Sequence, residues 1–156
     1  MLEKIISGGQ TGADQGALDG AISCKFRHGG SLPAGRKTED GVLPLSYDMV
    51  EMASDRYADR TEQNVVDGDA TLIVSHGRLT GGSELTMKIA KRLGKPCMHI
   101  DFNTYTTAQA AAKVSAWIES AQVRVLNVAG PRASTDFEIY DCARMLVVDL
   151  ITRLKR

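Results

Sequence analysis

Three short stretches rich in glycine and hydroxyl residues carry the groups best suited to hold an anion. They are SGGQTGADQG at 7–16, SHGRLTGGSELT at 75–86 and AGPRAST at 129–135, and each lies between a predicted strand and a predicted helix. Free backbone N–H groups and the helix dipole at such a helix start attract negative charge. Small residues let a phosphate approach the backbone closely. The sequence therefore predicts phosphate binding at these turns.

Side chains in the three turns could add polar contacts to a bound phosphate. Gln10, Thr11 and Asp14 belong to the first turn, and Arg132, in the third, has a side chain that binds phosphate with two parallel hydrogen bonds. One helix dipole contributes only about 0.3–1 kcal/mol, so several amides or a second turn are needed. The alternative is that these are tight turns that allow close helix–sheet packing and cap the helices. His76, at a strand exit, could contact ligand or be a structural hydrogen-bonding residue.

Two further segments are dense in charge. PAGRKTEDG at 33–41 lies in a long loop, and YADRTEQN at 57–64 lies in a polar helix where Arg60 and Asn64 share one face. Glu39 and Asp40 are the nearest candidates for acid–base chemistry, whereas a solvated charged surface is the alternative. The sequence shows no Ser-His-Asp set and no CxxC or HxxxH spacing typical of a metal site.

The elements that must position these residues alternate along the chain. Apolar runs predict strands over 2–7, 70–75, 96–101 and 123–128. Helical spacing predicts helices over 11–24, 46–66, 83–93 and 107–121, and a last helix from a Thr135–Glu138 capping box to residue 154. Ser83 is expected to cap the third helix. Residues 25–45, with four glycines and two prolines, predict a strand stub and a long loop.

This alternation predicts an α/β fold, a three-layer parallel sheet flanked by helices. The length, 156 residues, predicts one domain over 1–156. In such a sheet the ligand lies beyond the carboxyl ends of the strands. An apolar run in the last helix, residues 145–148 and 150–151, is apolar on more than one side and favours burial against another subunit.

Composition excludes several classes of function. The 19 basic and 19 acidic residues give a net charge of zero, which argues against a nucleic-acid partner. No stretch approaches the roughly 18 apolar residues of a membrane span, and no signal peptide is visible. The three cysteines are far apart, as expected of reduced thiols in a cytoplasmic protein.

Taken in order, the motifs SGGQTGAD, PAGRKTEDG, YADRTEQNV, DATLIV, GGSELT and a late GPR resemble the putative molybdenum carrier proteins. The resemblance covers nearly the whole chain. It implies a Rossmann-like fold that is circularly permuted relative to the phosphoribohydrolases once labelled lysine decarboxylases. It also implies a homo-oligomer, a dimer or tetramer, that binds and protects the molybdenum cofactor (molybdopterin), a pterin with a terminal phosphate.

The binding residues that this resemblance and the turns together suggest come from five segments of the chain. They are Gly8, Gly9, Gln10, Thr11, Gly12, Asp14, Pro33, Gly35, Arg36, Glu39, Asp40, Arg60, Thr61, Asn64, Gly81, Gly82, Ser83, Thr86 and Arg132. The phosphoribohydrolases carry PGGxGT followed by acidic residues. Here the stretch is TGGSELTMK, with Glu84 at a glycine position and Met87 and Lys88 where acidic residues are expected.

Three hypotheses for function follow. The leading one is a carrier that binds a phosphorylated small molecule, with molybdenum cofactor as the named ligand or a phosphate-bearing nucleotide otherwise. The second is a nucleotide-processing enzyme, similar to a nucleoside monophosphate phosphoribohydrolase, that uses Glu39, Asp40 and Glu84 for acid–base chemistry and Arg36 or Arg132 to hold phosphate. The third is a nucleotide-sensing module whose oligomeric state changes with ligand.

Overall fold

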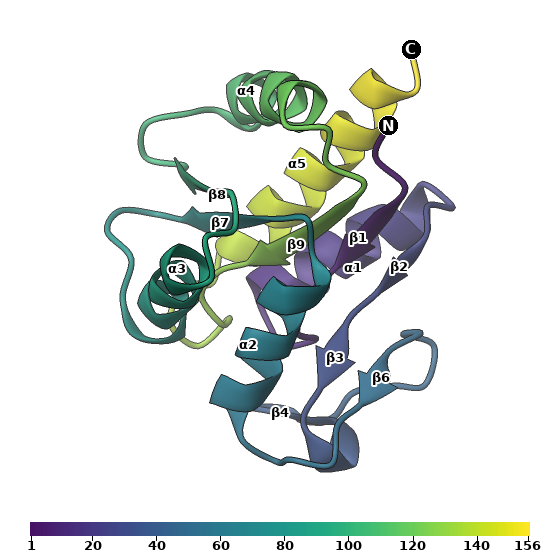
Figure 1. The fold of residues 1–156 in the computed structure, drawn as a ribbon, viewed down its shortest axis with the longest axis vertical. Coiled ribbons are helices and arrows are strands. Elements are labelled where there is room, and N and C mark those ends of the chain that lie inside the picture. Colours follow the sequence, from purple (N-terminus) through teal and green to yellow (C-terminus); the bar gives the residue numbers. More distant parts are fainter.

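Five parallel strands form the centre of the molecule, in the order β2-β1-β9-β7-β8 (Figure 1). The computed structural model describes all residues, 1–156. The strands of this sheet are β1 (Lys4–Ile6), β2 (His28–Gly29), β7 (Ala70–Ser75), β8 (Cys97–Asp101) and β9 (Val125–Ala129). Because all neighbours run parallel, every strand ends at the same edge of the sheet.

Helices cover both faces of the sheet, as expected for a three-layer α/β fold (Figure 1). One face carries α1 (Ala13–Ser23), α4 (Thr107–Ser120) and α5 (Ile139–Leu154), which share the main hydrophobic core. The other face carries α2 (Tyr57–Asp67) and α3 (Gly81–Arg92) around a small cluster of Val65, Ile89 and Ala90. β7 is buried along its whole length because strands flank it and helices cover it. The predicted fold class is confirmed.

Between β2 and α2 the chain makes an excursion beyond the carboxyl edge of the sheet (Figure 1). It contains β3 (Ser31–Leu32), η1 (Ala34–Arg36), β4 (Lys37–Thr38), β5 (Gly41–Val42) and β6 (Val50–Glu51). β3 pairs in parallel with β6, and β4 pairs with β5 as a small hairpin. This excursion brings residues 33–47 beside the first Gly-rich turn.

The predicted helix over 46–66 is wrong in its first half. The helix begins only at Tyr57, and Val50 and Glu51 instead form β6. The Arg36 side chain donates hydrogen bonds to the carbonyls of Leu43, Pro44 and Tyr47, which fixes this segment as a loop. These contacts join Arg36 to carbonyls 7 to 11 residues further along the chain, outside any helical spacing, so the sequence pattern could not reveal them.

Two predicted helix caps are also wrong. α5 begins after Glu138, and the Asp136 carboxylate accepts the Glu138 N–H at 3.0 Å, so Thr135 is not part of a capping box. α3 begins two residues before Ser83, and its N-cap residue, Thr80, makes no side-chain cap. The start of α3 is thus left without a side-chain acceptor for its first N–H groups. The capping box lies instead at α4, between Thr106 and Gln109.

The apolar run of the last helix is explained within one chain. Leu146, Val147, Leu150 and Ile151 are buried in the core formed with α1 and α4, whereas Met145 is 54% exposed. The apolar run therefore no longer supports homo-oligomerisation. Homo-oligomerisation itself stays a prediction.

Candidate functional site

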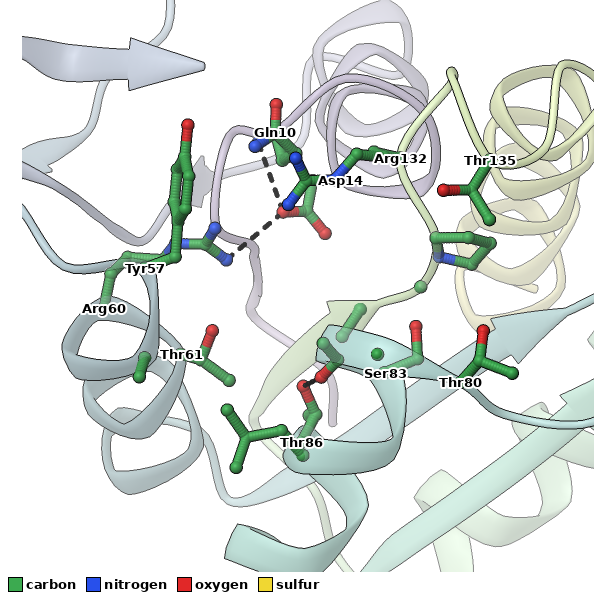
Figure 2. Close-up of a pocket in the computed structure, with 17 residues that line it drawn as sticks. Gln10, Asp14, Tyr57, Arg60, Thr61, Thr80, Ser83, Thr86, Arg132 and Thr135 are labelled. Carbon is green, nitrogen blue, oxygen red and sulfur yellow. Dashed lines mark hydrogen bonds and ion pairs between the residues drawn. The ribbon is translucent and has the colours of Figure 1, made fainter. Parts of the chain in front are cut away.

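A cavity of about 250 Å³ opens at the carboxyl edge of the sheet (Figure 2). Its walls are the first turns of α2 and α3, the connection from β9 to α5 at Ala129–Thr135, Gln10 of the turn after β1 and Asp14 of the first turn of α1. Most of these walls carry hydrogen-bond donors. Asp14 is the single carboxylate that lines the cavity.

The order of the strands explains why the cavity lies here. α1 leads from β1 outward to β2, whereas α3 leads from β7 in the opposite direction to β8, and β9 lies between β1 and β7. Helices that diverge from the middle of a parallel sheet leave a crevice beyond the strand ends, where ligands bind in open α/β folds. The predicted position of the site therefore coincides with a real cavity.

The first turn of α3 presents free donors to this cavity. The N–H groups of Gly81 and Gly82 have no acceptor within the protein, as expected for a helix start without a side-chain cap. Ser83 is 6% exposed, makes no side-chain hydrogen bond, and its hydroxyl points into the cavity (Figure 2). The Thr86 hydroxyl donates to the Gly82 carbonyl at 2.8 Å and holds this turn in place.

A buried ion pair forms the floor of the cavity. Arg60 Nη1 lies 3.6 Å from Asp14 Oδ2, and both side chains are almost fully buried. Burial raises the pKa of Asp14, although the Arg60 charge and the Gln10 N–H act in the opposite direction. The guanidinium lies so close to Gly8 that a Cβ there would be 2.1 Å from Arg60 Nη1. Gly8 is thus required for Arg60 to reach the cavity.

Two buried nitrogen atoms at this floor lack partners. They are Gln10 Nε2 and Arg60 Nε. The Gln10 side-chain oxygen accepts from the N–H groups of Thr11 (3.1 Å) and Glu39 (2.8 Å), which fixes the amide and leaves its NH₂ group unpaired. Buried donors without partners cost free energy and mark places where a ligand or water can bind.

Three cationic side chains lie around the Tyr57 ring at the side of the cavity. The guanidinium carbons of Arg60 and Arg132 each lie 5.5 Å from the centre of its ring, and Lys37 Nζ lies 4.8 Å from it. Glu39 is the nearest carboxylate to Arg132, at 3.9 Å, so this pair is loose. The cavity therefore combines free amides with guanidinium groups, which is the donor set that binds phosphate.

The first helix start, in contrast, is largely closed by the protein's own groups, although the sequence predicts phosphate binding at this turn as well. Ala13 N–H donates to the Pro131 carbonyl at 3.1 Å, and Gln10 N–H donates to Asp14. A Cβ at Gly12 would lie 2.5 Å from that carbonyl and 2.7 Å from Ala133 N. Gly12 is therefore a packing residue that lets the β9–α5 connection cross this turn.

Apart from Gly12 and the residues of the long loop, the predicted site residues fall into two groups. Arg60, Thr61, Gly81, Gly82, Ser83, Thr86 and Arg132 line the cavity together with Gln10 and Asp14. Gly8, Gly9, Thr11 and Asn64 support it from outside. Asn64 holds β3 by two hydrogen bonds to the Ser31 backbone, and Gly9 packs against Leu32 and Leu43.

The residues of the long loop lie outside the cavity. Arg36 is used to hold three loop carbonyls, Gly35 N–H donates to Glu51, Pro33 precedes η1, and Asp40 is exposed. The Glu39 carboxylate accepts hydrogen bonds from Thr11 and from the Ser134 N–H and hydroxyl. Glu39 thus ties the hairpin to two turns and does not face the cavity.

The third carboxylate assigned to acid–base chemistry also points away. Glu84 is exposed and pairs with Lys88 at 3.3 Å. Sequence reasoning also missed Tyr57, Thr80 and Thr135, which line the cavity. Tyr57 was visible as the aromatic residue that opens the YADRTEQN motif, but only the folded chain shows that three cations surround its ring.

No group of three or more His, Cys, Asp or Glu side chains is placed to hold a metal ion. None of the helices has the length and apolar character needed to cross a lipid bilayer.

Fold and cavity together define a Rossmann-like ligand-binding class, and comparison with known proteins gives the family. Residues 5–151 match the model of the circularly permutated YpsA SLOG family, so the chain belongs to this family. The permutation in this description is stated relative to YpsA, and the permutation relative to the phosphoribohydrolases stays an expectation.

A solved structure is similar over almost the whole chain. It is the crystal structure described as a "putative molybdenum carrier protein" from Syntrophus aciditrophicus SB, with 47% sequence identity and a TM-score of 0.94. The similarity covers 96% of this chain and 95% of that one. A search among curated proteins finds no match.

Proposed function

We propose that this chain binds a small organic molecule through a phosphate group held at the first turn of α3. The observation that carries the proposal is the pair of unpaired N–H groups at Gly81 and Gly82 beside Ser83, a largely buried residue whose hydroxyl has no hydrogen-bond partner within the protein. Helix starts of this kind bind anions. The volume of about 250 Å³ leaves room for an organic part next to the phosphate.

The charges of the cavity support an anionic ligand. Arg132 has only a loose partner, so its guanidinium is available to the phosphate, and the Arg60 guanidinium lies at the same distance from the Tyr57 ring. A hydrogen bond between charged groups contributes about 1.5–3 kcal/mol. The opposing charge of Asp14 is partly neutralised, because Arg60 lies beside it.

Molybdenum cofactor is the named candidate for this ligand. Support comes from the solved relative that is described as a molybdenum carrier, and from the fit between the cavity donors and a terminal phosphate. Gly81, Gly82, Ser83 and Arg132 would hold the phosphate, and Gln10 and Thr61 would contact the organic part. The cofactor would be cargo that the chain holds and shields from water.

Co-purification tests this candidate. The chain and a Ser83→Ala/Arg132→Gln double variant are produced in a host that makes the cofactor and isolated without denaturation. We expect bound pterin and molybdenum in the unchanged chain and a large loss of both in the variant. Equal amounts in both proteins, or none in the unchanged chain together with no protection of added cofactor, would contradict the candidate.

The two alternatives are separated by further measurements on the same samples. Incubation with nucleoside monophosphates would release free base if the chain were a phosphoribohydrolase. Glu39, Asp40 and Glu84 lie outside the cavity, which is why binding is favoured over this chemistry. Light scattering with and without nucleotide tests the sensing module and the predicted homo-oligomer.

A further inference from the structure

A second, smaller hollow of about 60 Å³ adjoins the cavity on the other side of the α3 start. The two share Thr80, Ser83, Pro131 and Thr135 as lining residues. The first turn of α3 is therefore a wall common to both hollows. A group bound at this turn can extend into either of them.

The Ser83 side chain marks the point where the two hollows meet. It is 6% exposed, lines both hollows and makes no hydrogen bond within the protein. In Figure 2 its hydroxyl points away from α3, in the same general direction as that of Thr80. A hydroxyl that opens into a hollow and has no protein partner is free to bind a ligand or water.

The smaller hollow is lined by a cationic side chain that does not line the larger cavity. Arg78 lines it, and its side chain forms no hydrogen bond or ion pair within the protein. The carboxylate in this hollow, Asp136, is already engaged, because His76 Nδ1 lies 2.6 Å from it and the Glu138 N–H donates to it. Arg78 is thus the cation of this hollow that has no partner within the protein, and the size of the hollow suits a phosphoryl group and not a ring system.

We propose that the ligand is a diphosphate ester whose two phosphoryl groups lie on either side of Ser83. One phosphoryl contacts Arg132 in the larger cavity, and the other contacts Arg78 in the smaller hollow. The organic part lies in the larger cavity toward Tyr57. This inference rests on the proposed function and narrows its ligand class, since a monoester would leave the smaller hollow and Arg78 unused.

Calorimetric titration of the full chain with inorganic phosphate and with pyrophosphate tests the inference. Each anion is titrated into the unchanged chain, Arg78→Gln, Arg132→Gln and Arg144→Gln. Arg144 lies exposed on α5, so its variant removes the same charge outside both hollows. We expect pyrophosphate to bind at least about tenfold more tightly than phosphate, as one added charged contact predicts.

The variants separate this inference from the proposed function. Arg78→Gln should remove most of the preference for pyrophosphate, Arg132→Gln should weaken binding of both anions, and Arg144→Gln should change neither. If Arg78→Gln and Arg144→Gln have the same effect, or if no preference exists, the diphosphate inference is wrong while phosphate binding stands. If neither anion binds, both proposals fail.

Discussion

Tyr57 is the residue that places positive charge beside the cavity without neutralising it. Arg60, on the same helix, and Arg132, from the β9–α5 connection, approach its ring at equal distances of 5.5 Å. An aromatic ring attracts cations through its quadrupole and brings no opposing charge. The ring therefore holds both guanidinium groups in place, and Arg132, whose only carboxylate contact is the loose one to Glu39, keeps its charge available to an anion, whereas Arg60 also pairs with Asp14.

Replacement of Tyr57 tests this role. Tyr57→Leu removes the ring and should lower phosphate affinity about three- to tenfold, since cation–π contacts at partly exposed sites contribute roughly 0.5–1 kcal/mol each. Tyr57→Phe keeps the ring and should bind phosphate as the unchanged chain does. Titration calorimetry compares the two. Equal affinity for both variants would show that the ring does not organise the cations.

Substitutions at Gly12 and Gly82 should have opposite effects on the free energy of unfolding, although both glycines lie at helix starts. Gly12 has a φ of +81°, and a Cβ there would meet the Pro131 carbonyl at 2.5 Å, so Gly12→Ala should lower the free energy of unfolding by at least about 2 kcal/mol. A Cβ at Gly82 meets nothing within 4 Å, so Gly82→Ala should preserve or slightly raise stability. Urea unfolding measures both. Similar stability of the two variants would show that the first turn is not closed by the β9–α5 connection.

Some site residues could be predicted from the sequence because their chemistry is local. Gly81, Gly82 and Ser83 follow a buried strand and open a helix, and this pattern alone indicates free amides. The hydrogen-bond partners of Arg36 and Glu39 could not be predicted in this way. The partners of Arg36 are backbone carbonyls 7 to 11 residues along the chain, and those of Glu39 lie in two distant turns that only the folded chain brings within reach.

At the scale of elements, the β4–β5 hairpin is tied to the rest of the molecule through Glu39. The hydrogen bonds from Ser134 and Thr11 hold the pKa of this carboxyl below its usual value. Because the folded chain prefers the ionised form, the stabilisation is present above the unfolded pKa of about 4.3 and is lost as pH falls below it.

The pH dependence of stability tests this connection. The free energy of unfolding of the unchanged chain should fall below pH of about 4.3, and Glu39→Gln should be less stable at neutral pH with a weaker fall on acidification. Glu119→Gln is the matched control, since Glu119 is exposed on α4 and its side chain has no hydrogen-bond partner. Parallel curves for the unchanged chain and Glu39→Gln would contradict the role of the tether.

The same excursion shows why one helix boundary was predicted wrongly. Residues 46–56 have thin helical spacing, but Val50 and Glu51 pair with Ser31 and Leu32, and Asn64 binds the Ser31 backbone. The free energy of these long-range contacts exceeds the weak helical preference of the segment. The strands of the central sheet, and the helices α1, α3, α4 and α5 beside it, carry strong apolar patterns of their own and were predicted to within a few residues.

At the scale of the whole molecule, the alternation of strands and helices was sufficient to predict a parallel sheet with its ligand at the carboxyl edge. The strand order was not accessible to this reasoning. Because β9 lies between β1 and β7, the third Gly-rich turn covers the first one and faces the second. This order, and not the glycine content of the turns, decides that α3 opens to the cavity while α1 is largely closed.

The most direct test of the account is a crystal structure of the chain soaked with inorganic phosphate. We predict a phosphate at the first turn of α3, within hydrogen-bond distance of the Gly81 and Gly82 N–H groups and the Ser83 hydroxyl, with Arg132 turned toward it. Phosphate bound only at the turn after β1, or an α3 start that stays empty under conditions where calorimetry shows binding, would contradict it.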